Sequence, residues 1–139
     1  MIICGVEIKG SEAIFALATR QSSGLAHLPL ATKKIALEDD EEPANVKAFA
    51  TQLASFVREK RRQPHRHQKA QQERRIRRRP DTFKIETIFQ LMSDCDVALI
   101  SPQTINAQNK KHAFALPDTL NKYQHEAYKA ACAGLMKSV

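Results

Sequence analysis

Residues 2–20 read IICGVEIKGSEAIFALATR, two apolar runs separated by a turn at Lys9-Gly10. Each run predicts a strand, because short apolar runs bounded by turn residues are typical of buried strands. The run at 27–37, which follows Gly24, predicts a third strand that is irregular near Pro29. Three strands joined by short turns predict an antiparallel meander at the start of the chain.

Helical periodicity replaces this pattern after the meander. Apolar residues in 39–57 fall on one helical face, and Pro43 suits the first turn of that helix. The segment 80–92 predicts a second helix, with Asp81 as its N-cap. The rest of the chain predicts a strand over 96–101, a short helix over 102–109 and a last helix over 116–137 that begins near Asp118 or Thr119. The written pattern gives two helices in succession, with no strand between them. We therefore expect a strand in the segment that joins these two helices.

That segment, 58–79, reads REKRRQPHRHQKAQQERRIRRR and holds the basic character of the chain. It carries eleven Lys or Arg and two acidic residues, whereas the other 117 residues carry eleven basic and thirteen acidic residues. As written, it predicts a solvated basic surface or an arm that binds phosphates by counterion release, with strong salt dependence. It has no aromatic residue on which an unpaired base could stack.

A third interpretation is a compensated pair of frame slips, one near Lys60 and one near Arg79. Back-translation read one base later permits RENGVSHIAIKKRNKNGEFAGG over 58–79. That reading supplies a strand, VSHIAI, and glycines for the turn after it. The written chain has four glycines, none of them between Leu25 and Ala133. Average usage of about 7% predicts roughly ten glycines, so the shifted reading restores what the written segment lacks.

Composition and motifs exclude several classes of protein. Cys4, Cys95 and Cys132 are far apart and form no C-x-x-C pair, which predicts buried reduced thiols. No phosphate-binding loop, dinucleotide motif or serine-hydrolase motif occurs. No signal peptide precedes the first strand, and no apolar stretch approaches the roughly 20 residues that span a bilayer. We therefore expect a cytoplasmic protein with a single domain over 1–139, in which 58–79 is anomalous.

The sequence on both sides of 58–79 resembles a small uncharacterised bacterial family of about this length. The resemblance is carried by GVEIKGSEA (5–13), PDTFKIETIFQL (80–91), VALISPQTI (97–105) and LNKYQHEAYKAA (120–131). Members of that family read F-A-G-G before F-K-(I/L)-E, as the shifted frame does and the written frame does not. The resemblance implies no particular activity.

The order of elements also resembles the ribonuclease-H-like fold in its Holliday-junction-resolvase branch. The resemblance implies three antiparallel strands followed by α/β crossovers, in a mixed five-stranded sheet. It also implies acids on the first strand, at the end of the fourth strand and on the last helix, where they hold two Mg²⁺ ions around a scissile phosphate. Glu7 matches the first acid, as catalytic residue and metal ligand, and Asp118 and Glu126 are the candidates for the third. The second falls within 58–79, where the shifted frame places Lys.

Several of these residues also have an ordinary interpretation. Glu7 is either a site residue or a side chain on the solvent side of the sheet. Lys9, Lys84 and Lys122 are candidate nucleic-acid contacts, although Lys9 is also typical of a surface lysine. Glu86 is typical of a solvated helix charge, and the same interpretation is open for Glu126.

Three functions follow from these observations. The chain is a nucleic-acid-associated protein with an incomplete acidic site, or a Mg²⁺-dependent nuclease, or a protein-interaction module that kept only the fold. The fold alone does not choose among them. Nucleic acid is the expected partner, a membrane is not, and Mg²⁺ is the only cofactor implied.

Overall fold

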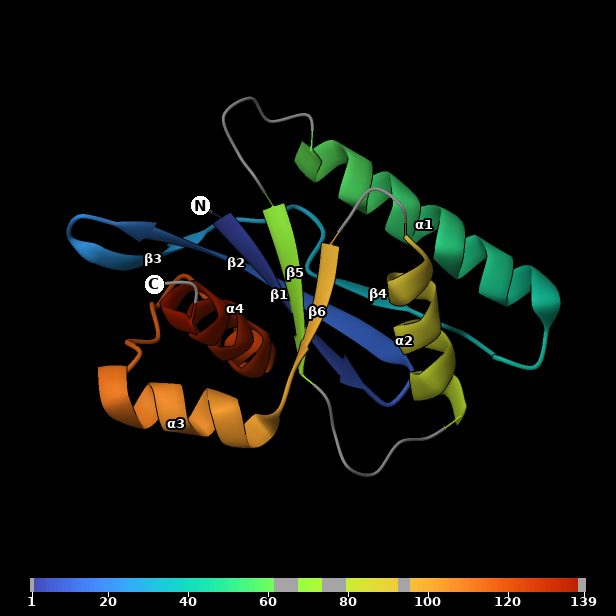
Figure 1. The fold of residues 1–139 in the computed structure, drawn as a ribbon. Helices are drawn as coiled ribbons and strands as arrows, with labels where there is room; N and C mark the ends of the chain where they lie inside the picture. The colour runs from blue at the N-terminus through green and yellow to red at the C-terminus, as the bar shows by residue number, and fades with distance from the viewer. Residues whose placement is uncertain (1, 62–67, 74–79, 93–95, 138–139) are drawn as a thin grey trace.

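The computed structural model describes residues 2–61, 68–73, 80–92 and 96–137 (Figure 1). In chain order its elements are β1 (Ile2–Lys9), β2 (Glu12–Gln21), β3 (Gly24–Leu28), β4 (Lys34–Ala36), α1 (Pro43–Arg61), β5 (Gln68–Glu73), α2 (Pro80–Leu91), β6 (Asp96–Ile100), α3 (Pro102–His112), the 3-10 helix η1 (Lys122–Gln124) and α4 (His125–Lys137).

The sheet has the strand order β3-β2-β1-β5-β6, and β4 pairs with β2 outside this path. The two strands of the opening sequence, β1 and β2, pair antiparallel from Ile2–Thr19 to Lys9–Glu12. Gly10 adopts a φ of 60° in the turn between them, a conformation that glycine reaches without steric cost. β5 then pairs parallel with both β1 and β6. The five-strand path therefore agrees with the expected mixed sheet.

Two boundaries differ from the sequence-based expectation. The run at 27–37 forms two strands, β3 and β4, because Pro29 has no N–H for the ladder and ends β3 at Leu28. The last helix does not begin near Asp118 or Thr119. η1 begins after Asn121, whose side chain and backbone form a capping box with Gln124, and α4 follows directly.

β5 lies inside the basic segment and is an interior strand of the sheet, between β1 and β6. The expectation of a strand between α1 and α2 is therefore confirmed. Its sequence is QKAQQE, whereas central parallel strands covered on both faces are normally rich in Val, Ile and Leu. The strand of the shifted reading, VSHIAI, would fall on 62–67, which lies outside the described residues.

Helices cover both faces of the sheet, with α1 and α2 on one side and α3 and α4 on the other (Figure 1). Side chains of β1 alternate between the two layers, as the pleat of a strand requires. Val6 and Ile8 belong to the cluster with α1 and α2, which includes Phe49. Ile3 belongs to the cluster with α3 and α4, which includes Ala131. Glu7 therefore lies on the α4 side of the sheet.

Candidate functional site

The parallel strands bring their carboxyl ends to one edge of the sheet. β5 leads into α2 on one face, and β6 leads into α3 on the other. Ligands of open α/β sheets bind outside the carboxyl ends of the strands, at a point where the connections diverge in this way. We call this region the carboxyl edge and define it by the end of β1, the first turns of α2 and α3, and the start of α4.

Glu7 is the third residue from the end of β1 and is 3% exposed. The alternative that its side chain points to solvent is therefore wrong. It shares the α4 face with Gly5, two residues earlier, where a Cβ atom would lie 1.7 Å from the carbonyl oxygen of Ala127. This close approach of α4 encloses the β1 face on which Glu7 lies. A buried carboxylate near the end of a strand whose carboxyl end opens toward this edge makes Glu7 a candidate for function.

Gln124 fixes the start of α4 against the β1–β2 pair. Its Nε2 donates to the carbonyl oxygen of Phe15 at 2.9 Å, and Phe15 is the ladder partner of Val6. The first turn of α4 therefore lies near the height of Glu7. Glu126, in that turn, is partly exposed and forms an ion pair with Lys129, with 3.4 Å between Oε1 and Nζ.

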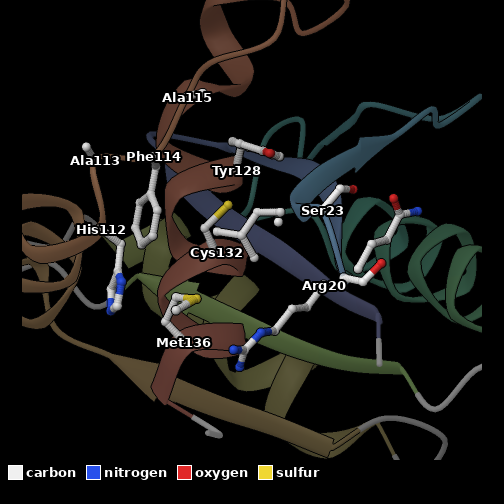
Figure 2. Close-up of a pocket in the computed structure, with 13 residues that line it drawn as sticks. Arg20, Ser23, His112, Ala113, Phe114, Ala115, Tyr128, Cys132 and Met136 are labelled. Carbon is white, nitrogen blue, oxygen red and sulfur yellow. The ribbon is translucent and has the colours of Figure 1, made fainter.

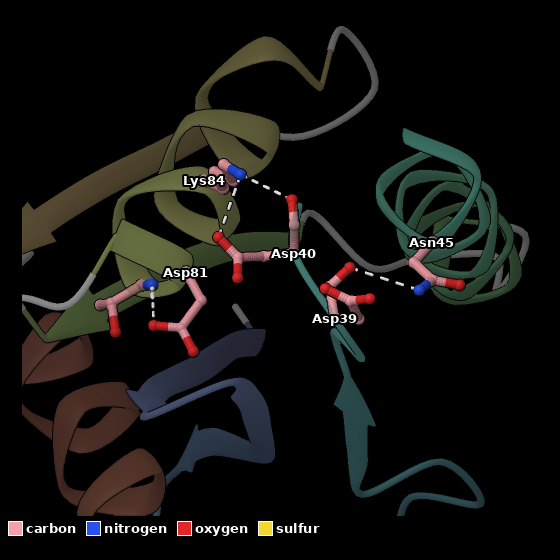
Figure 3. A network of polar contacts seen from close by, with 6 residues as sticks. Asp39, Asp40, Asn45, Asp81 and Lys84 are labelled. Carbon is pink, nitrogen blue, oxygen red and sulfur yellow. Dashed lines mark hydrogen bonds and ion pairs between the residues drawn. The ribbon is translucent and has the colours of Figure 1, made fainter. Parts of the chain in front are cut away.

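The first turn of α2 reaches the same edge (Figure 3). Thr82 Oγ1 donates to the carbonyl oxygen of Gly10 at 2.9 Å, which ties α2 to the turn that ends β1. Asp81 Oδ1 accepts the Thr82 backbone N–H at 2.9 Å, and Asp81 is 6% exposed. Sequence reasoning gave Asp81 only a capping role and missed it as a buried acid. The prediction that Glu86 is solvated is wrong, because Glu86 is also 6% exposed.

The register of β5 adds one further position. The β1–β5 ladder ends at the pair Val6–Gln72, and Glu73, which pairs with Ile100, is the next residue of β5, as Glu7 is the next residue of β1. The fourth-strand acid implied by the resemblance falls on this part of the chain, whose side chains lie outside the described structure. No local motif surrounds Glu73 in the written sequence. Glu73 is therefore identified as a candidate acid only by the pairing register of β5.

The described residues do not fit a two-Mg²⁺ site. Over these ranges, no group of three or more His, Cys, Asp or Glu side chains is arranged to hold a metal ion. Asp118 is exposed in the loop before η1, and Glu126 is engaged with Lys129. The candidate acids Glu7, Asp118 and Glu126 therefore form no common metal-binding cluster.

The three candidate cations occupy different surroundings. Lys9, at the end of β1, and Lys122, in η1, are exposed. Lys84 lies on the α1–α2 side, where its Nζ is 3.0 Å from Oδ2 of Asp40 (Figure 3). It also donates to the backbone carbonyl oxygen of Asp40 at 2.6 Å. The structure therefore gives Lys84 a structural partner and leaves Lys9 and Lys122 open to solvent.

The fold is ribonuclease-H-like and is similar to that of RuvC-like resolvases. A structure of Thermus thermophilus RuvC aligns with a TM-score of 0.70 at 12% identity, over 99% of this chain and 95% of that one. T. thermophilus RuvC in complex with a Holliday junction substrate gives 0.69 at 13% identity, over 99% and 95%. Fowlpox virus resolvase in a complex with Holliday junction DNA gives 0.56 at 16% identity, over 100% and 99%.

The chain belongs to the DUF3010 family, described as a protein of unknown function, whose model matches residues 1–134. No curated protein matches the sequence. None of the helices over the described ranges is both long enough and apolar enough to cross a bilayer.

Proposed function

We propose that this protein binds nucleic acid at the carboxyl edge and does not cut it. The observation that supports binding without cleavage is the state of the acidic site. Glu7 lies buried at the first-strand position, but the described acids form no metal cluster around it. A two-metal mechanism needs several carboxylates to bracket the scissile phosphate. The resolvase structures similar to this chain include complexes with Holliday junction DNA, which makes branched DNA the first substrate to test.

Exposed cations supply the proposed contacts. Lys9 and Lys122 flank the end of β1 and the start of α4, where each can pair with a backbone phosphate. The written segment 58–79, with a net charge of +9, would add a sequence-independent electrostatic contribution. Lys84 remains a predicted contact, although its pairing with Asp40 favours a structural role.

The test is a salt-dependent binding titration with a four-way DNA junction and a duplex of equal length. The Lys9→Gln/Lys122→Gln variant is expected to weaken binding and to reduce the slope of log K against log [salt] by about two, since each phosphate contact contributes roughly one. The matched control is Lys47→Gln/Lys110→Gln, which removes two exposed cations from α1 and α3 and should leave the slope unchanged. Equal slopes for the two variants would refute binding at the carboxyl edge.

A Mg²⁺-dependent nuclease is the second candidate, favoured by the positions of Glu73 and Glu7, each the next residue after the last pair of the β1–β5 ladder. Cleavage of the junction in Mg²⁺ that disappears in Glu7→Gln would establish this function and overturn the first. A protein with neither binding nor cleavage, but with a defined oligomeric state, would instead be an interaction module.

We further propose a single domain over 1–139 in the bacterial cytoplasm. Cys4 and Cys132 are free and buried, which agrees with a reducing compartment, where disulfides are rare.

A further inference from the structure

A pocket of about 440 Å³ lies at the opposite end of the sheet from Glu7. It is enclosed by the β2–β3 hairpin, the segment 112–115 after α3 and the second half of α4 (Figure 2). Thr19 pairs with Ile2 at the start of β1, so the hairpin tip begins where β1 begins. Five residues of strand, about 16 Å at 3.3 Å per residue, separate Ile2 from Glu7. This pocket is therefore distinct from the carboxyl edge.

The polar wall of the pocket is cationic. Arg20 lines it together with Ser22 and Ser23 of the hairpin turn and His112 at the end of α3. None of the lining residues is Asp or Glu. Within the described part of the chain, no carboxylate forms an ion pair with Arg20. A guanidinium and two hydroxyl groups with no acid beside them provide hydrogen-bond donors suited to an anionic oxygen group.

The pocket also has an apolar wall. Leu25, the ladder partner of Arg20, together with Phe114 and Met136 supplies carbon and sulfur surface, and Cys132 also lines the pocket (Figure 2). Burial raises the pKa of the Cys132 thiol to about 11, so the thiol is neutral at pH 7 and adds no negative charge. A ligand that fills this wall needs an apolar body.

The rim of the pocket holds an unusual backbone conformation. Ala113 has a φ of 49° and a ψ of 66°, in the left-handed region that disfavours a residue with a Cβ atom. Two hydrogen bonds to Asn109 maintain it, from the N–H of Ala113 to the backbone oxygen at 2.7 Å and from the N–H of Phe114 to Oδ1 at 3.1 Å. At the rim, the residue before Ala113, His112, is exposed, and the residue after it, Phe114, is buried. Ala113 is the C-cap of α3, so this conformation ends the helix and sets the course of the chain into the pocket lining.

We propose that this pocket binds a small organic anion that has an apolar body, with Arg20 as the ligand of its phosphate or carboxylate group. The volume lies within the range of about 300–1,000 Å³ for small-molecule sites. The combination of one unpaired cation, neighbouring hydroxyls and an apolar wall favours an amphipathic ligand over inorganic phosphate alone.

The experiment is a titration of the full-length ¹⁵N-labelled protein followed by amide chemical shifts. The probes are phenyl phosphate, benzoate, inorganic phosphate and benzyl alcohol. Phenyl phosphate or benzoate is expected to shift amides of residues 20–25 and 112–115 and to leave those around Glu7 unchanged. The tighter of these two probes identifies the anionic group as a phosphate or a carboxylate.

Arg20→Gln is expected to weaken binding of that probe about tenfold or more, because a charge-assisted hydrogen bond is lost. Arg58→Gln is the matched control, since Arg58 is an exposed arginine on α1, and it should bind within about twofold of the unchanged protein. Both variants replace exposed residues, and their amide spectra verify that they fold.

Three results would overturn the proposal. The first is the absence of shifts at these amides up to about 10 mM probe, about tenfold above a millimolar dissociation constant. The second is an equal effect of inorganic phosphate or benzyl alcohol, which would remove the need for an anionic group on an apolar body. The third is unchanged binding in Arg20→Gln.

Discussion

Gly5 is the residue over which α4 crosses the sheet most closely. A Cβ atom there would lie 1.7 Å from the carbonyl oxygen of Ala127 and 2.9 Å from the backbone nitrogen of Ala131. Both neighbours are backbone atoms of one helix, so neither can move alone. The absence of a Cβ atom at Gly5 therefore lets α4 pack closely on β1. This close packing buries the side of β1 that carries Glu7, two residues further along.

Gly5→Ala is expected to lower the free energy of unfolding by about 3 kcal/mol or more, because overpacking against backbone displaces a whole helix. Gly24→Ala is the comparison, since a Cβ atom at Gly24 meets nothing within 4 Å and only its φ of 122° opposes the change. We expect Gly24→Ala to cost about 1–2 kcal/mol from backbone strain alone. Urea unfolding of the two variants tests this order, and a smaller loss for Gly5→Ala would contradict the close packing.

His27 links β3 to the loop before η1. Its Nδ1 is 3.1 Å from Oγ1 of Thr119, and its ring meets Tyr128 edge-on at 5.7 Å between centroids. Over the described structure, its Nε2 is buried without a hydrogen-bond partner. Burial, together with the positive charge of Lys33, lowers the pKa of His27 below its usual 6.5.

The lowered pKa predicts a loss of stability in acid. The unfolded chain binds a proton at His27 more readily than the folded chain, so stability is fully present above pH 6.5 and falls as the pH decreases below it. His27→Gln removes this contribution and should flatten the pH dependence of the midpoint of urea unfolding between pH 7 and pH 5. A variant with the same pH dependence as the unchanged protein would assign the effect to other groups.

Among the elements, β5 combines an interior position in the sheet with a polar sequence. Its backbone pairs on both sides, with β1 and with β6, while its residues are QKAQQE. Polar side chains in a central strand are costly unless each finds a hydrogen-bonding partner. The shifted reading would place KKRNKN on these six positions, so the composition of β5 does not discriminate between the two frames.

The frame-slip hypothesis predicts the masses of peptides from this segment. Peptide mapping of the purified protein across residues 58–84 should give masses that match the reading HIAIKKRNKNGEFAGG, and none that match the arginine-rich written sequence. The peptide from Ile85 onward serves as an internal control, because both readings share it. Masses of the written peptides would refute the slip and make the basic segment the leading nucleic-acid contact.

At the scale of the whole molecule, the two faces of the sheet differ in the side chains that they carry. The face under α1 and α2 is an apolar layer that contains Phe15 stacked on Phe56, with ring centroids 4.3 Å apart. The other face carries Glu7 at one end and the pocket with Arg20 at the other. Candidate binding chemistry is therefore concentrated on the α3–α4 side.

Binding without cleavage predicts a weak response to magnesium. If the described acids form no metal cluster, 10 mM Mg²⁺ should shift the thermal midpoint by less than about 1 °C, since a ligand stabilises a protein only through a site it occupies. A site with a Kd one hundredfold below that concentration would add about 2.7 kcal/mol, or several degrees. Differential scanning calorimetry with EDTA and with Mg²⁺ distinguishes these cases, and Ca²⁺ tests whether any shift depends on the ion.

Pattern and resemblance predicted much of the fold before any coordinates. The apolar runs of β1 and β2, the periodicity of α1 and the helix predicted at 80–92 were evident because they depend on the local pattern of apolar residues. The split of 27–37 and the start of the last helix were not predicted correctly. Those boundaries depend on ladder hydrogen bonds and on the contact between Gln124 and Phe15, which join residues far apart in the chain.

The sequence by itself determined the family resemblance, the meander and the need for a strand between two helices, because each depends on residues close together along the chain. Tertiary structure alone decided that Glu7 is buried, that Asp81 is a second buried acid and that Lys84 pairs with Asp40. It also created the pocket from a hairpin near the start of the chain, at 20–25, and two segments near its end, at 112–115 and 128–136. Burial, ion pairing and cavities arise from which surfaces meet in space, and that arrangement is fixed only when the helices pack on the sheet.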